Sequence, residues 1–463
     1  MTTDAVAVTD QIARFALEAD VAAGPAALRE AALSALIDTI GVAIAGRNDS
    51  GFRALLEGTR EEIRPGPATM WATGQRTSPA YAALVNGTAA HALDYDDVSD
   101  PMYGHPSVAL YPSLVAVAQA EGSSGAELLD AYVVGFEITG AIASALPILP
   151  HYYRGWHSTA TVGVLASTAA ICRLLHLDIE DTRRALGIAA STASGSRQNF
   201  GTNTKPLHPG LSSWSAVTAA RLAQSGFTAD DHQLEAPLGY FAMYGTESDL
   251  SAVAKWLDQR WAILAPAAGV SVKKYPCCYN THRSADATLD LAAEIADPGS
   301  ISGVRVTVEP GGLAPVIHHR PITGLEGKFS VEYVVAAGLL DRRVRLATFT
   351  DEAVARPEAQ ALLRKVEVAE SPTPPFGEAG FDYQYSAVEI DTGDTVLRRR
   401  VDIPSGHSRD PLAADALEEK FLDCVSFSAV PWDGAELIAA LRSLPTDARL
   451  DAFDRFVEAP LPA

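Results

Sequence analysis

Hydrophobic residues recur at helical spacing through the first 265 residues of the chain. The segments with the clearest pattern are 27–46, 78–92, 106–121 and 125–146. Asp178 is positioned to cap a further helix, because its carboxylate can accept hydrogen bonds from free N–H groups of the first turn. These segments are rich in Ala and Gly, whose small side chains allow close packing. The pattern predicts a core of many helices, some of them buried on all sides.

The pattern changes near residue 265. Two helical segments, 281–296 and 329–341, are interspersed with alternating, β-branched stretches that are typical of strands. These stretches are SISGVRVTVEP, RKVEVAES, YQYSAVEID and TVLRRRVDI, and the last two are joined by a hairpin turn around Thr392, Gly393 and Asp394. Helical patterns return from residue 404, in LAADALEEKFLDCV, GAELIAALRSLP and TDARLDAFDRFVE.

These patterns predict a mostly α protein with two domains. A large all-helical domain is formed by residues 1–266 and 404–463, and a smaller α+β lid domain, residues 267–403, is inserted before the C-terminal helices. The length of 463 residues agrees with two domains, since single hydrophobic cores stop growing at roughly 250–300 residues.

The net charge of the chain limits the classes of ligand that it can bind, and its cysteines indicate its cellular location. The formal net charge of −21 disfavours nonspecific binding to nucleic acid or to an anionic membrane. Any anionic substrate therefore needs a local basic pocket. The four cysteines form no C-x-x-C motif, which is typical of a reduced cytosolic protein. We expect a cytoplasmic protein because the N-terminus lacks the pattern of a signal peptide and no segment has a transmembrane pattern.

The first candidate cluster is HALDYDDVSDPMYGHPS, residues 91–107. Asp94 and Asp97 are three residues apart and would share a helix face, and His105 lies in a predicted loop. A carboxylate beside an imidazole can orient it and tune its pKa, as proton transfer requires. Composition alone favours a solvated acidic loop. A metal site is a third alternative, although the spacing matches no standard metal motif.

Two further clusters carry basic and imidazole groups. In HYYRGWHSTA, residues 151–160, His157 precedes a helix that Ser158 or Thr159 would cap, while Arg154, Tyr152 and Tyr153 offer hydrogen-bond donors to an anion at the helix start. In GSRQNFGTNTKPLHPG, residues 195–210, a predicted polar loop holds Arg197, Lys205 and His208. For both clusters, an ordinary solvated loop is an equally good interpretation.

The fourth cluster, VKKYPCCYNTHRSADA, lies at the junction of the two predicted domains, where ligands often bind. It contains Lys273, Lys274, Tyr275, His282 and Arg283. For Cys277 and Cys278 simple burial is the favoured interpretation. A fifth cluster adds His318, His319, Arg320 and Lys328. Together the clusters place cationic and imidazole groups of an acidic protein between apolar helices, which suits a polyanionic small molecule.

Five motifs resemble those of the MmgE/PrpD family, in the family's order and over nearly the whole chain. They are HALDYDD followed by GHPS, then GWHSTATVG, TKPLHPG, KKYPCCYNTHRSADA and GLEGKFSVEY. The resemblance implies a large helical domain with a smaller lid domain, a homodimer, and no metal or organic cofactor. Activities known in the family are dehydration of 2-methylcitrate, decarboxylation of cis-aconitate and epimerisation of iminodisuccinate.

The family's active-site pattern falls on Asp94, His105, His157, Lys205 and Lys273. The resemblance also makes Tyr153, Arg154, Tyr275 and His282 candidates for binding the substrate. Two positions depart from the family's patterns. Val98 stands where decarboxylase-like members have Thr, and Asp96 stands where dehydratase-like members often have Asn. The pattern therefore indicates the chemistry better than the substrate.

The family's reactions all create or quench negative charge on a carbon next to a carboxylate. Lys205 and Lys273 suit the binding of carboxylates, and His105 and His157 suit proton transfer, with Asp94 as an orienting group or a base. The main hypothesis is a cofactor-independent lyase that acts on a small di- or tricarboxylate. The alternatives are an epimerase that removes and returns an α-proton, and a non-catalytic binder of polycarboxylates.

Overall fold

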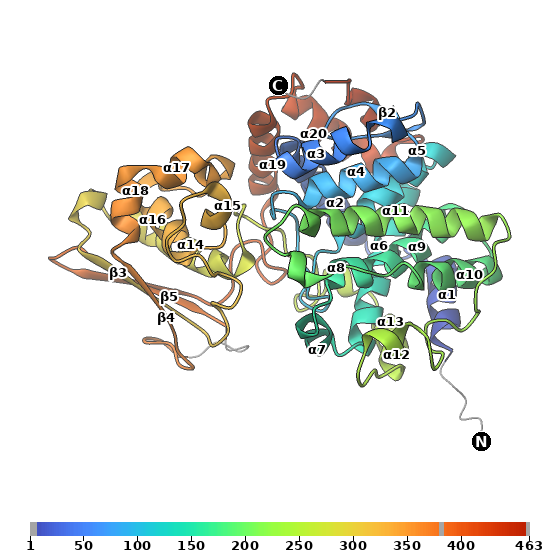
Figure 1. The fold of residues 1–463 in the computed structure, drawn as a ribbon, viewed down its shortest axis with the longest axis horizontal. Coiled ribbons are helices and arrows are strands. Elements are labelled where there is room, and N and C mark those ends of the chain that lie inside the picture. Colours follow the sequence, from blue (N-terminus) through green and yellow to red (C-terminus); the bar gives the residue numbers. More distant parts are fainter. Residues whose placement is uncertain (1–6, 379–383, 460–463) are drawn as a thin grey trace. The chain divides into compact units, whose positions relative to one another are not determined.

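The computed structural model describes residues 7–378 and 384–459 of the chain (Figure 1). The chain divides into two units, the first formed by residues 1–272 and 414–463 and the second by residues 273–413. The predicted limits of the inserted domain were 267 and 403. The first unit is almost entirely helical and the second combines helices with a sheet, so the predicted mostly α fold class is confirmed.

The helices predicted in the first unit are present within one or two residues of their expected limits. They are α2 (Ala27–Gly46), α4 (Pro79–His91), α5 (Ser107–Glu121) and α6 (Gly125–Ala145). Asp178 caps α10 (Ile179–Ala190) as predicted, since its carboxylate accepts the N–H of Asp181 at 2.8 Å. The remaining helices before the second unit are α1 (Val8–Glu18), α3 (Ser50–Gly58), α7 (Ile148–Tyr153), α8 (Ser158–Thr161), α9 (Gly163–Leu174), α11 (Thr204–Gln224), α12 (Tyr240–Tyr244) and α13 (Ser251–Gln259).

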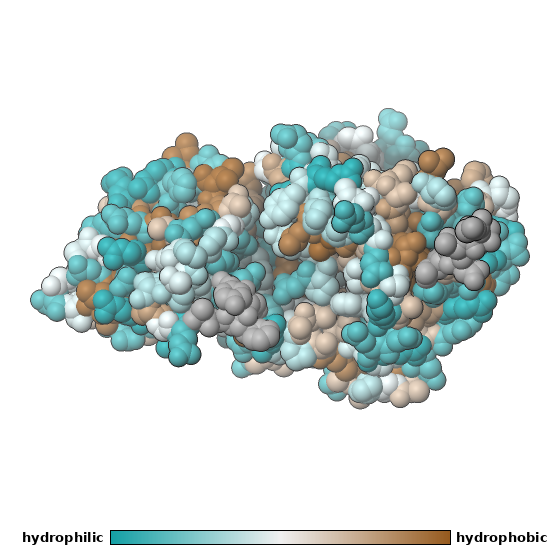
Figure 2. Space-filling view, turned by 90° about the horizontal axis from the view of Figure 1, so that it is seen from below, coloured by the Kyte–Doolittle hydropathy of each residue, from teal (hydrophilic) through white to brown (hydrophobic). Residues whose placement is uncertain are grey.

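Helix α6 runs through the interior of this unit. By length and composition it could cross a membrane, which the sequence interpretation did not anticipate, but 94% of its most apolar 18-residue window is buried. Such burial is typical of a central helix in a folded core. Figure 2 shows one face of the molecule, on which hydrophilic residues are interspersed with smaller hydrophobic groups.

Two glycines bring α4 and α11 close together. A Cβ atom on Gly87 would lie 2.9 Å from the Cα atom of Gly210, and a Cβ atom on Gly210 would lie 2.5 Å from the carbonyl oxygen of Leu84. The two helices therefore pack backbone against backbone at this point. As a result, His91 at the end of α4 comes close to the beginning of α11, where Lys205 lies.

The chain returns to the first unit with α19 (Ala414–Ser428), which packs on α2. Lys420 of α19 forms a buried ion pair of 2.5 Å with Asp38 of α2. Helix α20 (Gly434–Ser443) follows as predicted. The helix predicted over residues 446–458 is wrong, since only a short 3₁₀ helix, η8 (Asp451–Arg455), forms there. The apolar residues Leu450, Phe453 and Phe456 recur every three residues, which matches the three-residue turn of a 3₁₀ helix.

The second unit is built on a four-stranded sheet with the order β4-β3-β5-β6. Its strands are β3 (Gly303–Val308), β4 (Val366–Glu370), β5 (Ser386–Asp391) and β6 (Val396–Val401). Strand β3 pairs parallel with β4 and antiparallel with β5. The predicted hairpin between β5 and β6 is confirmed, with Gly393 at φ +86° in its turn. Tyr383, the first residue of one predicted strand, lies outside the described residues.

Helices cover one face of this sheet (Figure 1). The two long ones, α14 (His282–Ala292) and α16 (Val331–Asp341), lie in the predicted segments and pack against each other. They enclose an apolar core with Val304, Val306 and Val388 of the sheet. The shorter helices are α15 (Gly324–Gly327), α17 (Asp351–Ala355) and α18 (Pro357–Leu363).

The close approach of α4 and α11 leads to a prediction about stability. We expect Gly210→Ala to lower the free energy of unfolding by about 1–3 kcal/mol, because the new methyl group meets the backbone of Leu84 and cannot be relieved by a rotamer change. Urea denaturation measures the loss. Gly58→Ala in α3 is the matched control, since nothing lies within 4 Å of its Cβ position. Equal stability of the two variants would contradict the packing described.

Candidate functional site

The site begins where α4 ends at His91. Asp94 has a φ of +54° and turns the chain, so that Asp96 and Asp97 enter the interior, where they are buried. The expectation that Asp94 and Asp97 share a helix face is therefore wrong. The left-handed turn at Asp94 ends the helical run, a conformation that Asp tolerates better than most residues.

The loop after Asp94 is held by contacts from distant parts of the first unit. Val98 pairs with Ser271 through two backbone hydrogen bonds of 2.9 Å. The ammonium of Lys420 donates to the carbonyl oxygen of Tyr95 at 2.9 Å and lies 4.0 Å from the centroid of its ring. These contacts fix the backbone on both sides of Asp96.

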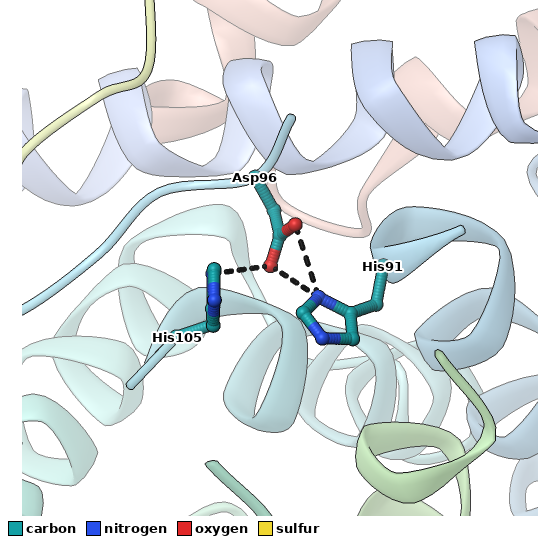
Figure 3. Close-up of side chains that lie close together, drawn as sticks. All are labelled: His91, Asp96 and His105. Atoms are coloured by element: carbon teal, nitrogen blue, oxygen red, sulfur yellow. Dashed lines mark hydrogen bonds and ion pairs between the residues drawn. The ribbon is translucent and has the colours of Figure 1, made fainter. Parts of the chain in front are cut away.

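The carboxylate of Asp96 lies between two imidazoles (Figure 3). The Nδ1 atom of His91 is 3.0 Å from Oδ1 and 2.9 Å from Oδ2, and the Nδ1 atom of His105 is 3.0 Å from Oδ2. Asp96 and His91 are completely buried, and the His105 side chain is 12% exposed. Burial alone would raise the pKa of Asp96, but His105 and His91 hold this pKa well below its ordinary value.

The His91 imidazole is held in its neutral form, and the Nδ1 atom of His105 has a second acceptor nearby. Burial lowers the pKa of His91 to about 4, although the charge of Asp96 opposes that shift. The Nδ1 atom of His105 is also 2.8 Å from the carbonyl oxygen of Asp97. Since a carbonyl oxygen can only accept a hydrogen bond, Nδ1 of His105 carries the proton and its Nε2 atom is left with a lone pair.

Asp97 belongs to a separate buried network. Its carboxylate accepts hydrogen bonds from the hydroxyl and the N–H of Ser107, and that hydroxyl is 2.7 Å from the hydroxyl of Tyr132. Burial raises the pKa of Asp97 to about 8, and the nearby Asp38 adds to the shift. Asp97 therefore supports the loop, with its carbonyl oxygen directed at His105 and its side chain directed away.

A second pair of imidazoles comes from α8 and α11. The Nδ1 atom of His157 is 3.0 Å from the Nδ1 atom of His208, so one nitrogen donates to the other. Burial lowers the pKa of His157 well below its ordinary value and also lowers the pKa of His208. His208 and Lys205 lie in the first turns of α11, which corrects the prediction of a polar loop. Pro206 suits the first turn of a helix because its missing N–H has no partner there in any case.

The predicted caps of α8 are also wrong. His157 occupies the N-cap position and forms no side-chain cap. The hydroxyl of Ser158 instead donates to the carbonyl oxygen of Tyr103 at 2.7 Å, and the hydroxyl of Thr159 accepts the N–H of His105 at 3.1 Å. Both hydroxyl groups thus connect α8 to the loop before α5 and help to place His105.

Lys205 and Asp94 form the charged pair of the site. Their side chains are 2.6 Å apart and each is 13% exposed. The ammonium of Lys205 also lies 5.2 Å from the ring centroid of Phe200, and that ring packs edge to face on His157 at 5.0 Å. The pair remains accessible at the edge of a cluster whose other members are largely buried.

The imidazoles and the lysine form one cluster. The ring centroid of His91 is 4.6 Å from that of His105 and 5.7 Å from that of His157. The charge of Lys205 contributes to the lowered pKa values of His91, His157 and His208. The first unit therefore brings together four of the five residues predicted to be catalytic, namely Asp94, His105, His157 and Lys205.

The other predicted residues lie elsewhere. Lys273 is the first residue of the second unit, so its meeting with Lys205 stays a prediction. In that unit, the hydroxyl of Tyr275 donates to Asp286 at 2.6 Å, and the ring of Tyr275 packs on His282 at 5.2 Å. Tyr153 and Arg154 end α7 with exposed side chains, and 71% of Tyr153 is exposed. Their roles in substrate binding also stay predictions.

Cys277 and Cys278 are buried, as their favoured interpretation predicts.

Within the described ranges, one group of side chains has the composition of a metal site, namely His91, Asp96 and His105, whose donor atoms lie within 4.8 Å of one another. However, both Nδ1 atoms face the carboxylate at hydrogen-bond distances of 2.9–3.0 Å. Metal–nitrogen distances are about 2.0–2.1 Å, and a metal would need a bare nitrogen where His105 carries a proton. The arrangement suits hydrogen bonding better than metal binding.

Sequence analysis did not assign a role to His91, Asp96 or His208. All three stand in the motifs that carry the family resemblance, and His91 is five residues from Asp96. The signal was the concentration of imidazoles in an acidic chain. Their pairing depends on the turn at Asp94 and on the crossing of α4 and α11, which no local pattern reveals.

Comparison with known proteins identifies the family of the chain. The model of the MmgE/PrpD N-terminal domain matches residues 10–252, and the model of the C-terminal domain matches residues 275–442. The chain belongs to the MmgE/PrpD family and is an enzyme of that family.

Three relatives are named cis-aconitate decarboxylase. The human protein is 30% identical over 425 residues, which cover 88% of this chain and 86% of the relative. The protein of Mus musculus is 31% identical over 402 residues, covering 83% and 80%. The protein of Aspergillus terreus is 25% identical over 439 residues, covering 89% and 88%.

The lowered pKa of His91 predicts how stability changes with pH. Below pH 6.5 the unfolded chain protonates this imidazole, while the folded chain does so only near pH 4, so its contribution to stability is lost as the pH falls from 6.5 to 4. We expect His91→Asn to reduce this loss by about 2 kcal/mol between pH 7 and pH 4.5. Urea denaturation at pH 7 and pH 4.5 measures it. Parallel pH curves for the two proteins would contradict the neutral, buried imidazole.

Proposed function

We propose that this enzyme is a lyase that removes CO₂ from cis-aconitate or a closely related small unsaturated polycarboxylate. The observation that carries the proposal is the cluster of neutral imidazoles beside the Asp94–Lys205 pair. It combines groups for proton transfer with a cation for a carboxylate. The decarboxylases among the relatives support the reaction class.

The proposed chemistry needs only the side chains of the protein. When the carbon–carboxylate bond breaks, CO₂ leaves and the electron pair enters an allylic system, in which the carbon–carbon double bond of the substrate connects it to a remaining carboxylate group. An imidazolium then delivers a proton to carbon, and the neutral imidazole recovers a proton from water. His105 and His157 are the proposed acid and base groups. In this proposal no metal or organic cofactor takes part.

Electrostatics explains how neutral imidazoles provide an acid. Before substrate binds, burial and Lys205 disfavour the protonation of His91 and His157. A polycarboxylate brings several negative charges close to them, and a nearby negative charge raises the pKa of an imidazole. Substrate binding therefore promotes the protonation that the reaction uses. Lys205 would bind one carboxylate while it remains paired with Asp94, and Lys273 is the proposed cation for a second one.

We expect Lys205→Met to lower kcat/KM for cis-aconitate by at least about 100-fold, because the carboxylate loses its cation and Asp94 is left without its partner. Release of CO₂ and mass spectrometry of the product measure turnover. Lys255→Met is the control, since Lys255 is exposed on α13 and forms only surface contacts with Asp249 and Ser251. Equal losses in the two variants would count against the assigned role of Lys205.

Heavy water separates the alternatives in the same assay. A decarboxylase incorporates one deuteron at one end of the allylic system that the loss of CO₂ leaves. An epimerase exchanges the α-proton of its substrate for a deuteron, and the substrate loses neither CO₂ nor water. A dehydratase releases water. If a panel of di- and tricarboxylates binds saturably but none of them is converted, the protein is a binder of these compounds. The proposed enzyme activity is then excluded for them.

The family resemblance also leads us to propose a homodimer. Helix α11 presents apolar side chains on its outer face, with Leu211 39% exposed and Trp214 41% exposed one turn further on. Burial of this face against a second copy would remove apolar surface from water. A cytoplasmic location likewise stays a prediction, in agreement with four cysteines that are free and buried.

Sedimentation equilibrium tests the assembly. We expect a mass of twice 48.8 kDa for the protein and a shift toward the monomer for the double variant Leu211→Glu, Trp214→Glu, because charges would be buried at the interface. Phe227→Glu is the control, since Phe227 is exposed beyond the end of α11. A monomer at micromolar concentration would overturn the proposal.

A further inference from the structure

The buried carboxylate of Asp96 contacts two imidazoles, those of His91 and His105. Of these two, only His105 has a role in the proposed chemistry. Asp96 accepts a hydrogen bond from Nδ1 of His91, and its Oδ2 atom lies 3.0 Å from Nδ1 of His105, whose hydrogen bond goes to the carbonyl oxygen of Asp97 (Figure 3). His91 is 1% exposed, and its Nε2 atom is buried with no hydrogen-bond partner. A ring in this position can act on the site through the carboxylate without touching the substrate.

The hydrogen bonds determine where the protons of both rings lie. Asp96 is ionised because its pKa is well below the ordinary value, so it can only accept hydrogen bonds. His91 is neutral at pH 7, and its single proton is on Nδ1, facing Asp96. The proton of His105 is also on Nδ1, since that atom faces Asp96 and the carbonyl oxygen of Asp97. Both Nε2 atoms therefore keep a lone pair.

We propose that His91 is a positioning residue for His105, acting through the Asp96 carboxylate that the two rings share. The Nδ1–H of His91 holds this carboxylate ionised and in place. The carboxylate in turn keeps His105 in the tautomer whose Nε2 atom is free to exchange a proton with the substrate. This inference rests on the proposed function for the chemical role of His105, but the tautomer itself is a property of the unliganded protein.

The physical reason is the cost of an isolated buried charge. Asp96 is completely buried, and its contacts with the two rings offset the loss of hydration. When the donor on the His91 side is removed, the carboxylate is left with weaker stabilisation, so it takes up a proton more readily or turns away. In either case the carboxylate no longer favours the proton on Nδ1 of His105. Only the carbonyl oxygen of Asp97, 2.8 Å away, then favours that tautomer, so the fraction of the other tautomer rises.

Two substitutions of His91 separate this role from simple packing. The amide nitrogen of Asn takes the place of Nδ1 and can still donate to Asp96, whereas the amide of Gln extends to the Nε2 position and leaves the Nδ1 position empty. We expect His91→Asn to keep kcat within about threefold of the wild type. We expect His91→Gln to lower kcat by about 100-fold with little change in KM, because proton transfer fails while carboxylate binding through Lys205 is kept.

A measurement on the unliganded protein tests the same idea independently of activity. In ¹⁵N NMR of the imidazole rings at pH 7.5, we expect His105 in the Nδ1–H form in the wild type and in His91→Asn, and a mixture of tautomers in His91→Gln. Asp96→Asn provides a second, isosteric variant. It removes the charge, and in either orientation its NH₂ group lies 2.9–3.0 Å from Nδ1 of His91, where two donors face each other, so it should also disturb the tautomer of His105.

The outcomes are distinguishable. Wild-type kcat and an unchanged His105 tautomer in His91→Gln would overturn the positioning role, as would equal losses in His91→Asn and His91→Gln with unchanged thermal midpoints. If His91→Gln fails to fold, Asp96→Asn decides the matter by the same two measurements. If the wild type converts no polycarboxylate at all, the proposed function fails, while the NMR comparison still confirms or refutes the coupling between His91 and His105.

Discussion

The burial of an acidic segment is the constraint on which the rest of the first unit depends. Asp96 and Asp97 both lie in the interior, where an unpartnered carboxylate would cost several kcal/mol. The fold meets that cost in two ways. Asp96 stays ionised between two imidazoles, whereas Asp97, with a pKa of about 8, is largely protonated near neutral pH and bonded to Ser107. Two adjacent aspartates thus differ in charge, one ionised and one neutral. Each charge state determines the hydrogen bonds that its neighbours can form.

The same constraint shapes the electrostatics of the cluster. Burial lowers the pKa values of His91, His157 and His208, and the first unit offers Lys205 as a cation that is already balanced by Asp94. The unliganded cluster therefore carries little excess positive charge, although its proposed ligand is an anion. In the proposed function, binding of a polycarboxylate is coupled to the protonation of these imidazoles. This links binding and acid catalysis in one event, since the protonation that attracts the substrate also supplies the acid.

The sequence predicted the helices of the first unit and the strands of the second because these follow repeating local patterns. Asp94, His105, His157 and Lys205 could be predicted as one site because the family resemblance relates positions that are far apart in the chain. The partners of these residues could not be predicted in this way. The pairing of His91 with His105 depends on a single left-handed residue, Asp94, and on the glycine contact between α4 and α11. Lys205 was placed in a loop because its polar neighbours obscured the start of a helix.

The return of the chain to its first unit has a consequence for biosynthesis. Lys420, which binds the carbonyl oxygen of Tyr95 and the carboxylate of Asp38, is separated from both by the whole of the second unit. A ribosome therefore exposes the loop with Asp96 long before it makes the lysine that anchors it. The nascent N-terminal helices must wait, with Asp38 still lacking its ammonium partner, until about 380 later residues have emerged. Truncated chains that end before α19 would be natural substrates for chaperones and proteases.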